Sequence, residues 1–331
     1  MRGGVEFDPN GDFAIANLPV FGLSDGDKAS LKVERTPDNL YKATLRGDMV
    51  DGRGFVKSTM SGGVDVKKGR TPTFDLDLDA KLGTVAGFKG EALRNVDLHL
   101  LRRSGVIRNL ALNARLGEGG LQGELRGKPG ERQIVYLESN DAGALFRFSD
   151  TYARMLGGQM WLTMDPPTPD GARQKGQIDV REFAVRGEQA LDAVVAGAPN
   201  RDTNGVQFSR MRVEFTRTPG KMLIHQGLVT GPTVGATIDG VMDYAANEVH
   251  MRGTFVPLYG LNAAFGQLPI VGFFLGGNEG LIGSMTYEVY GPPGAPVLRV
   301  NPISMVAPGF VRKFLEFPSS LPNGFPAPDR P

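Results

Sequence analysis

Three aspartates at alternate positions are the first residues in the sequence that could do chemistry. Asp75, Asp77 and Asp79 bring three carboxylates close together, and carboxylate oxygens are ligands that Ca²⁺ prefers. A calcium site needs these groups to converge in a loop, whereas alternate residues of a β-strand stand side by side about 6.5–7 Å apart. We therefore interpret them as the solvent-facing side of a strand.

The histidines, the tryptophan and a glycine-rich run also fail to form a recognisable site. His99, His225 and His250 alternate with apolar residues, which favours positions on a solvent-facing strand surface over metal ligation. Trp161 is interpreted as a packing residue. The run GEGGLQG at 117–123 lacks GxGxxG spacing and is interpreted as a hairpin turn.

The common catalytic motifs are missing. The sequence has no GxSxG elbow, HExxH pair or GxxxxGK[ST] loop, and without cysteine it has no disulfide, thiolate metal site or cysteine nucleophile. Lys plus Arg number 37 and Asp plus Glu 36, so the net charge of +1 gives no case for nucleic-acid binding. We expect no enzyme, no metal or other cofactor, and no nucleic-acid partner.

The dominant pattern is the alternation of apolar and polar residues, which is typical of strands with one apolar face. In FDLDLDAKL at 74–82, every even residue is apolar and every odd residue is charged. Similar runs recur, separated by turn signals such as Asp51-Gly52 and Pro219-Gly220. The sequence therefore predicts an all-β antiparallel meander of about eighteen short strands.

Three stretches depart from the alternation. Asp141 is expected to cap a helix that ends at Gly157-Gly158. The charge-free segment 253–278 contains Pro269 and predicts two short helices, and 308–317 predicts an amphipathic helix. The Pro-rich tail 318–331 is predicted to be disordered. The apolar residues of the first helix would be Leu145, Phe148, Tyr152, Met155 and Leu156.

A sheet with one apolar face must cover that face. It can fold into a sandwich or closed barrel, face lipid as a transmembrane barrel, or form an open groove covered by bound lipid. One Trp and seven Tyr are too few for the aromatic girdles of a transmembrane barrel, which is the least favoured alternative. For an ordinary soluble fold of this length, the sandwich is the default.

The C-terminal part has a distinctive order of motifs. Strands are followed by the charge-free PLYGLNAAFGQLPIVGFFLGG, a strand with GSMTYEVYGP, and then VNPxSxxxPGxxR with an apolar helix. NDAGALFRFSDTYARMLGGQM lies upstream. This order resembles the C-terminal region of the bacterial AsmA-like superfamily over residues 130–317. Residues 1–130 fit the repeating strands of that family without carrying a specific motif.

AsmA-like proteins are large envelope proteins of Gram-negative bacteria, with an N-terminal inner-membrane helix and a β-sheet groove that crosses the periplasm. The resemblance implies transport of phospholipids between inner and outer membrane, with acyl chains carried along the groove. It also implies a periplasmic location and contact with the outer membrane, or a protein in it, at the C-terminal end. No anchor or secretion signal is visible in this sequence, so we expect it to be part of a longer chain.

The expected fold is an elongated, twisted antiparallel sheet curled into an apolar groove, with a few short helices near the C-terminus. Residues 1–130 would form repeating strands, 131–317 the AsmA-like region and 318–331 the tail. The residues expected to contact lipid are Leu76, Leu78, Leu98, Leu100, Leu110, Leu112, Met211, Val213, Phe215, Val234, Ile238, Met285 and Tyr287. Those expected to contact the membrane or a partner are Phe265, Ile270, Phe273, Phe274, Phe310 and Phe314.

Two other functions are alternatives to lipid transport. A structural or assembly factor of the outer membrane could use the same sheet to hold client β-strands by edge pairing. An envelope hydrolase is disfavoured, because the sequence offers no nucleophile next to a base.

Overall fold

The computed structural model describes residues 1–9, 13–61, 74–127, 132–168, 171–196, 204–257 and 285–301. Strand accounts for 65% of this part of the chain and helix for 9%, so the protein is all-β, as predicted. The strands are β1 (Arg2–Phe7), β2 (Phe13–Phe21), β3 (Lys28–Arg35), β4 (Leu40–Asp51), β5 (Asp75–Ala86), β6 (Ala92–Arg103), β7 (Val106–Leu116), β8 (Gly119–Arg126), β9 (Ile134–Ser139), β10 (Met155–Met164), β11 (Gln174–Val185), β12 (Val206–Thr218), β13 (Lys221–Thr230), β14 (Val234–Asp243), β15 (Glu248–Pro257), β16 (Met285–Gly291) and β17 (Val297–Asn301). The helices are α1 (Arg53–Met60), α2 (Ala142–Phe148) and α3 (Gln189–Val194).

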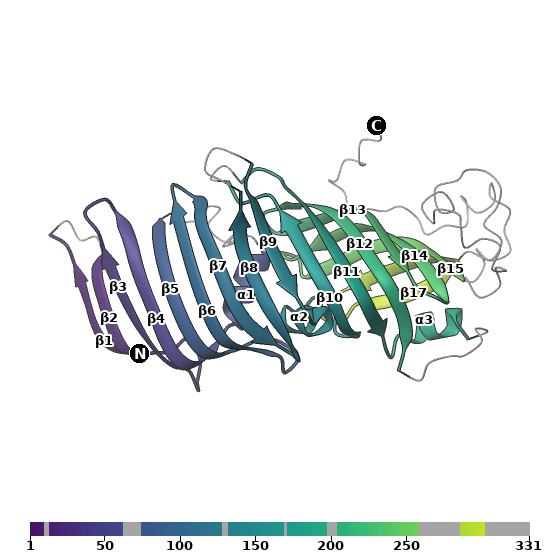
Figure 1. The fold of residues 1–331 in the computed structure, drawn as a ribbon, viewed down its shortest axis with the longest axis horizontal. Helices are drawn as coiled ribbons and strands as arrows, with labels where there is room; N and C mark the ends of the chain where they lie inside the picture. The colour runs from purple at the N-terminus through teal and green to yellow at the C-terminus, as the bar shows by residue number, and fades with distance from the viewer. Residues whose placement is uncertain are drawn as a thin grey trace.

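All seventeen strands belong to one sheet that is not closed on itself. Each strand pairs with the next strand in the chain, so the sheet is long and its spatial order follows the sequence (Figure 1). Most connections are short turns. The Pro219-Gly220 turn, for example, joins β12 to β13 and places Gly220 at φ 78°, a conformation that glycine adopts without strain.

The sheet is mixed rather than purely antiparallel, which corrects the prediction. Strands β4 and β5 run parallel, with Leu45 opposite Ala80. Parallel neighbours need a crossover rather than a tight turn, and α1 begins this connection after β4. The expected turn at Asp51-Gly52 is instead the start of α1, where the Gly52 N–H donates to the Ala86 carbonyl at 2.8 Å.

Helix α2 begins where the sequence predicted and ends earlier. The Asp141 carboxylate accepts a hydrogen bond from the Ala144 N–H at 2.8 Å and caps the helix. The helix stops at Phe148 because Asp150 turns the chain at φ 53° and Met155 then enters β10, where sheet hydrogen bonds replace helical ones. The residues wrongly assigned to this helix are Tyr152, Met155 and Leu156.

The three described helices all come before β12 in the chain, and α1 and α3 were not predicted. Of the charge-free segment 253–278, Gly253–Pro257 form the end of β15 rather than the start of a helix. Its remaining residues, the segment 308–317 and the tail 318–331 lie outside the described residues.

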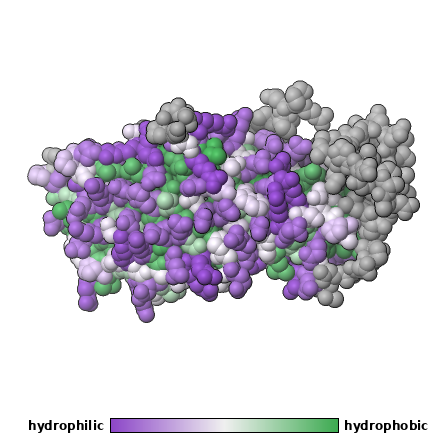
Figure 2. Space-filling view, viewed as in Figure 1, coloured by the Kyte–Doolittle hydropathy of each residue, from purple (hydrophilic) through white to green (hydrophobic). Residues whose placement is uncertain are grey.

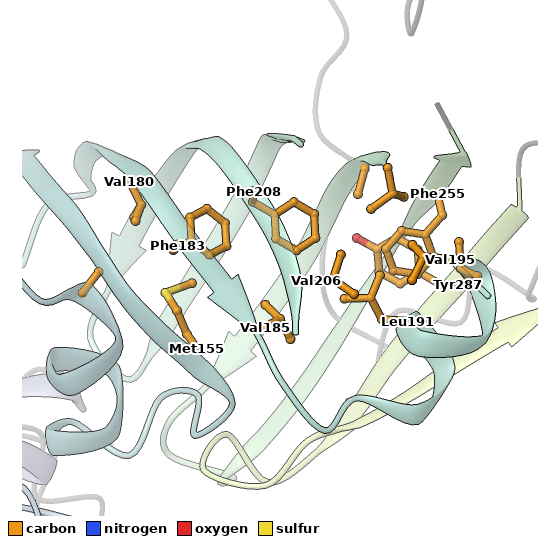
Figure 3. Packing of buried hydrophobic residues seen from close by; sticks show 14 of the residues in the cluster. Met155, Val180, Phe183, Val185, Leu191, Val195, Val206, Phe208, Phe255 and Tyr287 are labelled. Carbon is orange, nitrogen blue, oxygen red and sulfur yellow. The ribbon is translucent and has the colours of Figure 1, made fainter. Parts of the chain in front are cut away.

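The main hydrophobic core lies between α2, α3 and the strands from β10 onward. Leu191 and Val195 face Phe255 and Tyr287 (Figure 3), and α3 contacts β17. The sheet also folds back on itself. A Cβ on Gly294, in the turn between β16 and β17, would lie 1.9 Å from a carboxylate oxygen of Asp150, just after α2. The C-terminal half of the sheet is therefore packed against its own helices.

Candidate functional site

One face of the sheet carries an unbroken row of apolar residues and glycines. Directly opposed residues in neighbouring strands point to the same face, so the row can be followed from partner to partner. We call the face that carries it the apolar face. From β2 to β17 the row reads Leu18, Leu31, Leu45, Ala80, Leu98, Leu112, Gly123, Leu137, Leu162, Ile178, Val213, Gly227, Ile238, Gly253, Tyr287 and Val300.

All residues predicted to contact lipid lie on the apolar face. They either belong to the row or stand two or four positions from it along the same strand, as Leu100 and Leu110 do opposite each other on β6 and β7. The structure thus brings residues from β5, β6, β7, β12, β14 and β16 onto one surface. Binding of lipid to them stays a prediction.

Sequence reasoning missed Leu125, Val135 and Leu137 on β8 and β9, which connect the two groups of predicted residues. The alternation of Leu121, Gly123 and Leu125 was the available signal. Glycine in the middle of that run weakens it, because only two of the three positions are visibly apolar.

The two halves of the apolar face differ in exposure. On β12 to β16 the predicted residues are mostly buried, and Phe215 is only 2% exposed. On β5 to β7 the predicted leucines keep part of their surface exposed, and we call the apolar face from β3 to β9 the open half. The half-buried leucines on β5 to β7 are Leu76, Leu78, Leu98, Leu100, Leu110 and Leu112.

Protein side chains already cover the apolar face on β12 to β16, which we call the packed half. The Tyr287 ring stacks on Phe255 with centroids 4.2 Å apart, and its hydroxyl donates to the Thr237 carbonyl at 2.6 Å. Burial raises the pKa of Tyr287. Gly253 makes room for this ring, since a Cβ there would lie 2.7 Å from it. Tyr287 therefore acts as a core residue in this half.

Helices cover one rim of the open half. Phe148 at the end of α2 lies against Gly87, where a Cβ would meet its ring at 2.2 Å, and its carbonyl accepts from the Phe88 N–H at 3.1 Å. Val56 of α1 packs against the cluster that contains Val50 and Leu82. This rim, at the ends of β4 to β7 nearest α1 and α2, is called the helical rim.

The opposite face of the sheet is charged. The Asp77 carboxylate lies 3.0 Å from His99 Nε2, and Asp79 pairs with Arg46 at 2.9 Å. The Arg46 hydrogen bond holds the pKa of Asp79 below its ordinary value. Figure 2 shows that the face turned to the viewer is mostly hydrophilic, with small apolar areas. Asp75, Asp77 and Asp79 thus have partners on a solvated strand face, as interpreted from the sequence.

A second charged group on this face surrounds Asp179, which is buried. Its carboxylate accepts from Arg210 Nε at 3.0 Å, and Arg212 and Arg181 lie within 3.5 Å. Burial alone would raise the pKa of Asp179, but the three arginines outweigh it and the pKa is lowered. Trp161 lies beside this group, with the Arg181 guanidinium 5.2 Å from its ring, so it packs under a cation rather than in the core.

Other candidate features yield no additional site. His99 and His225 are exposed and His250 is half-buried, and within the described ranges no three His, Asp or Glu side chains are grouped to hold a metal ion. None of the described helices has the length and apolar character needed to cross a bilayer. The residues predicted to contact the membrane, Phe265, Ile270, Phe273, Phe274, Phe310 and Phe314, lie outside the described residues.

Comparison with known proteins gave no match to any family model, curated protein or solved structure.

Proposed function

We propose that the open half of the apolar face binds the acyl chains of phospholipids, and that the protein carries phospholipids between the two membranes of a Gram-negative envelope. The observation that carries this proposal is the row of apolar residues on the open half, in which half-buried leucines such as Leu98 and Leu112 lie opposite each other and no charged residue interrupts the path from strand to strand.

The energetics of acyl chains favour such a surface. Each CH₂ group removed from water contributes about 0.8 kcal/mol, so a chain gains most from a path that stays apolar over its whole length. Soluble proteins rarely expose apolar patches larger than a few hundred Å² without a binding role. A lipid in the open half would cover the exposed leucine surface, while its headgroup would remain in water beyond an uncovered rim.

The resemblance to the AsmA-like superfamily supports the same function and adds the cellular setting. It suggests a periplasmic protein, part of a longer chain anchored in the inner membrane, whose C-terminal end meets the outer membrane or a protein there. No cofactor or covalent intermediate is needed, because lipid moves by exchange of non-covalent contacts.

A second function, holding client β-strands, is favoured by the ends of the sheet. Within the described part of the chain, β1 pairs only with β2 and β17 only with β16, and Val5 and Val297 are about half exposed. A strand with an unpaired edge can accept another strand.

Mass spectrometry of the chain purified without detergent tests the proposal. We expect phospholipids to co-purify, and added phospholipid to slow amide exchange in β5 to β7. A chain that carries no lipid, takes up none when it is added, and already protects β5 to β7 fully would overturn it. Capture of a peptide strand at β1 or β17 in that lipid-free chain would favour the client-strand function.

A further inference from the structure

Four aromatic side chains form a ladder at the rim of the sheet opposite the helical rim. The ring centroids of Phe7 and Phe13 are 6.4 Å apart, those of Phe13 and Tyr41 5.8 Å, and those of Tyr41 and Phe74 5.8 Å. They come from β1, β2, β4 and the residue before β5. Phe7 is 63% exposed and Phe74 44% exposed, so the ladder faces water rather than a core.

The ladder continues directly from the open half of the apolar face. Tyr41 lies opposite Leu76 in the parallel pair, and Phe74 precedes Leu76 by two positions in the chain, just before β5 begins. Leu76 in turn lies opposite Arg102 on β6. An acyl chain on these leucines would therefore reach the aromatic side chains at this rim.

Arg102 lies at the Phe74 end of the ladder. The Arg102 guanidinium lies 4.9 Å from the centre of the Phe74 ring. Its Nε and Nη2 donate to the Phe74 carbonyl at 3.2 and 3.0 Å, and among the described residues no carboxylate forms an ion pair with it. The neighbouring Arg103, by contrast, pairs with Asp38 at 2.7 Å. Arg102 thus keeps its positive charge available at the end of the ladder.

We propose that the ladder and Arg102 hold the phosphate-bearing headgroup of a phospholipid whose acyl chains lie on the open half. Aromatic rings suit the boundary between acyl chain and water, because they are apolar and tolerate partial exposure. An arginine guanidinium forms strong, charge-assisted hydrogen bonds to phosphate oxygens. Because α1 and α2 cover the helical rim, headgroups leave the sheet at the opposite rim, which carries the aromatic ladder. This inference rests on the proposed function and assigns the headgroup to one side of the sheet.

The test compares Arg102→Gln with the matched control Arg94→Gln, an exposed arginine near the other end of the same strand. The probes are a phosphatidylglycerol and a diacylglycerol with the same fluorescent acyl chains. A charge-assisted hydrogen bond contributes about 1.5 kcal/mol, so Arg102→Gln should weaken phosphatidylglycerol binding about tenfold. Diacylglycerol binding should not change, and Arg94→Gln should bind both probes as the unaltered chain does.

A second variant separates charge from folding. Arg102→Lys keeps the positive charge and should retain most of the phosphatidylglycerol affinity, even if Arg102→Gln folds poorly. The headgroup assignment would be overturned if Arg102→Gln weakened the binding of both probes equally, or if it weakened the binding of neither. Competition by millimolar inorganic phosphate would also overturn it in favour of a free-phosphate site. Absence of binding of both probes to the unaltered chain would instead refute the proposed function itself.

Discussion

Replacing Leu112 by aspartate places a charge in the middle of the open half. Leu112 is half-buried on β7, opposite Leu98 on one side and Gly123 on the other. Its side chain fills the space above Gly123 together with Leu137, since a Cβ on Gly123 would lie 3.4 Å from Leu112 Cβ and 3.2 Å from Leu137 Cδ1. The pairing of β7 with β6 and β8 is made by backbone groups, so the variant should affect the apolar path more than the pairing of the strands.

The magnitudes follow from this partial burial. Complete burial of a leucine contributes about 1.5–3 kcal/mol, so losing the largely buried Leu112 side chain costs about 1–2 kcal/mol of folding free energy. A carboxylate in the path must stay hydrated and would expose about two or three CH₂ groups of a bound chain. That loss amounts to about 2 kcal/mol, or roughly a thirtyfold weaker affinity.

The assay is equilibrium binding of a phospholipid with a fluorescent acyl chain, with urea unfolding of the same samples. Ala111→Asp is the matched control, because Ala111 is the neighbouring residue on the charged face and is exposed. We expect Leu112→Asp to lose about thirtyfold in affinity and Ala111→Asp to bind nearly unchanged. Equal affinities of the two variants would refute the reasoning, as would complete unfolding of Leu112→Asp.

Substitutions at four further positions are predicted to change stability, and each is measured by urea unfolding. Gly253→Ala should lower the free energy of unfolding by about 2–4 kcal/mol, because its Cβ would lie 1.8 Å from the Thr237 carbonyl oxygen. Gly54→Ala in α1, where an added Cβ would meet nothing within 4 Å, should raise the free energy of unfolding by about 0.5–1 kcal/mol. A stabilising Gly253→Ala or a destabilising Gly54→Ala would contradict the packing described. Asp141→Ala removes the cap of α2 and should cost about 1 kcal/mol, whereas Asp141→Asn should cost less. Asp179→Asn should cost about 1–2 kcal/mol near neutral pH, since its arginine partners are partly exposed. The pKa of Asp179 is lower in the folded chain than its ordinary 3.8, so this stability is present above that value and is lost as the pH falls below it. A difference between the two chains that grows as the solution is acidified would contradict this assignment.

The alternation of apolar and polar residues was enough to predict the strands and the residues that share a face. In β5, for example, the two faces follow directly from the sequence. Strand direction could not be predicted in this way, because alternation is the same in parallel and antiparallel pairs. The sequence therefore favours a turn at Asp51-Gly52, whereas in the structure Gly52 caps the N-terminus of α1, which begins the connection to the parallel strand β5.

The exposure of the apolar face depends on contacts between segments that are distant in the chain. Leu112 and Val213 both follow the alternation, yet Leu112 is half-buried and Val213 is 6% exposed. The difference arises because Val213 packs in a cluster with Ile224 of β13, Met242 of β14 and Val249 and Met251 of β15. The aromatic ladder was missed for the same reason, since Phe7 and Phe74 are joined only through rings on other strands.

The central claim is that lipid lies on the apolar face and not on the charged face. The most direct measurement introduces a photo-crosslinking benzophenone side chain at Leu98 or, as the matched control, at His99, the next residue along β6 on the charged face. After illumination with phospholipid present, mass spectrometry of the intact chain should find a lipid adduct at position 98 and none at position 99. Equal capture at both positions, or no capture at position 98, would contradict the claim.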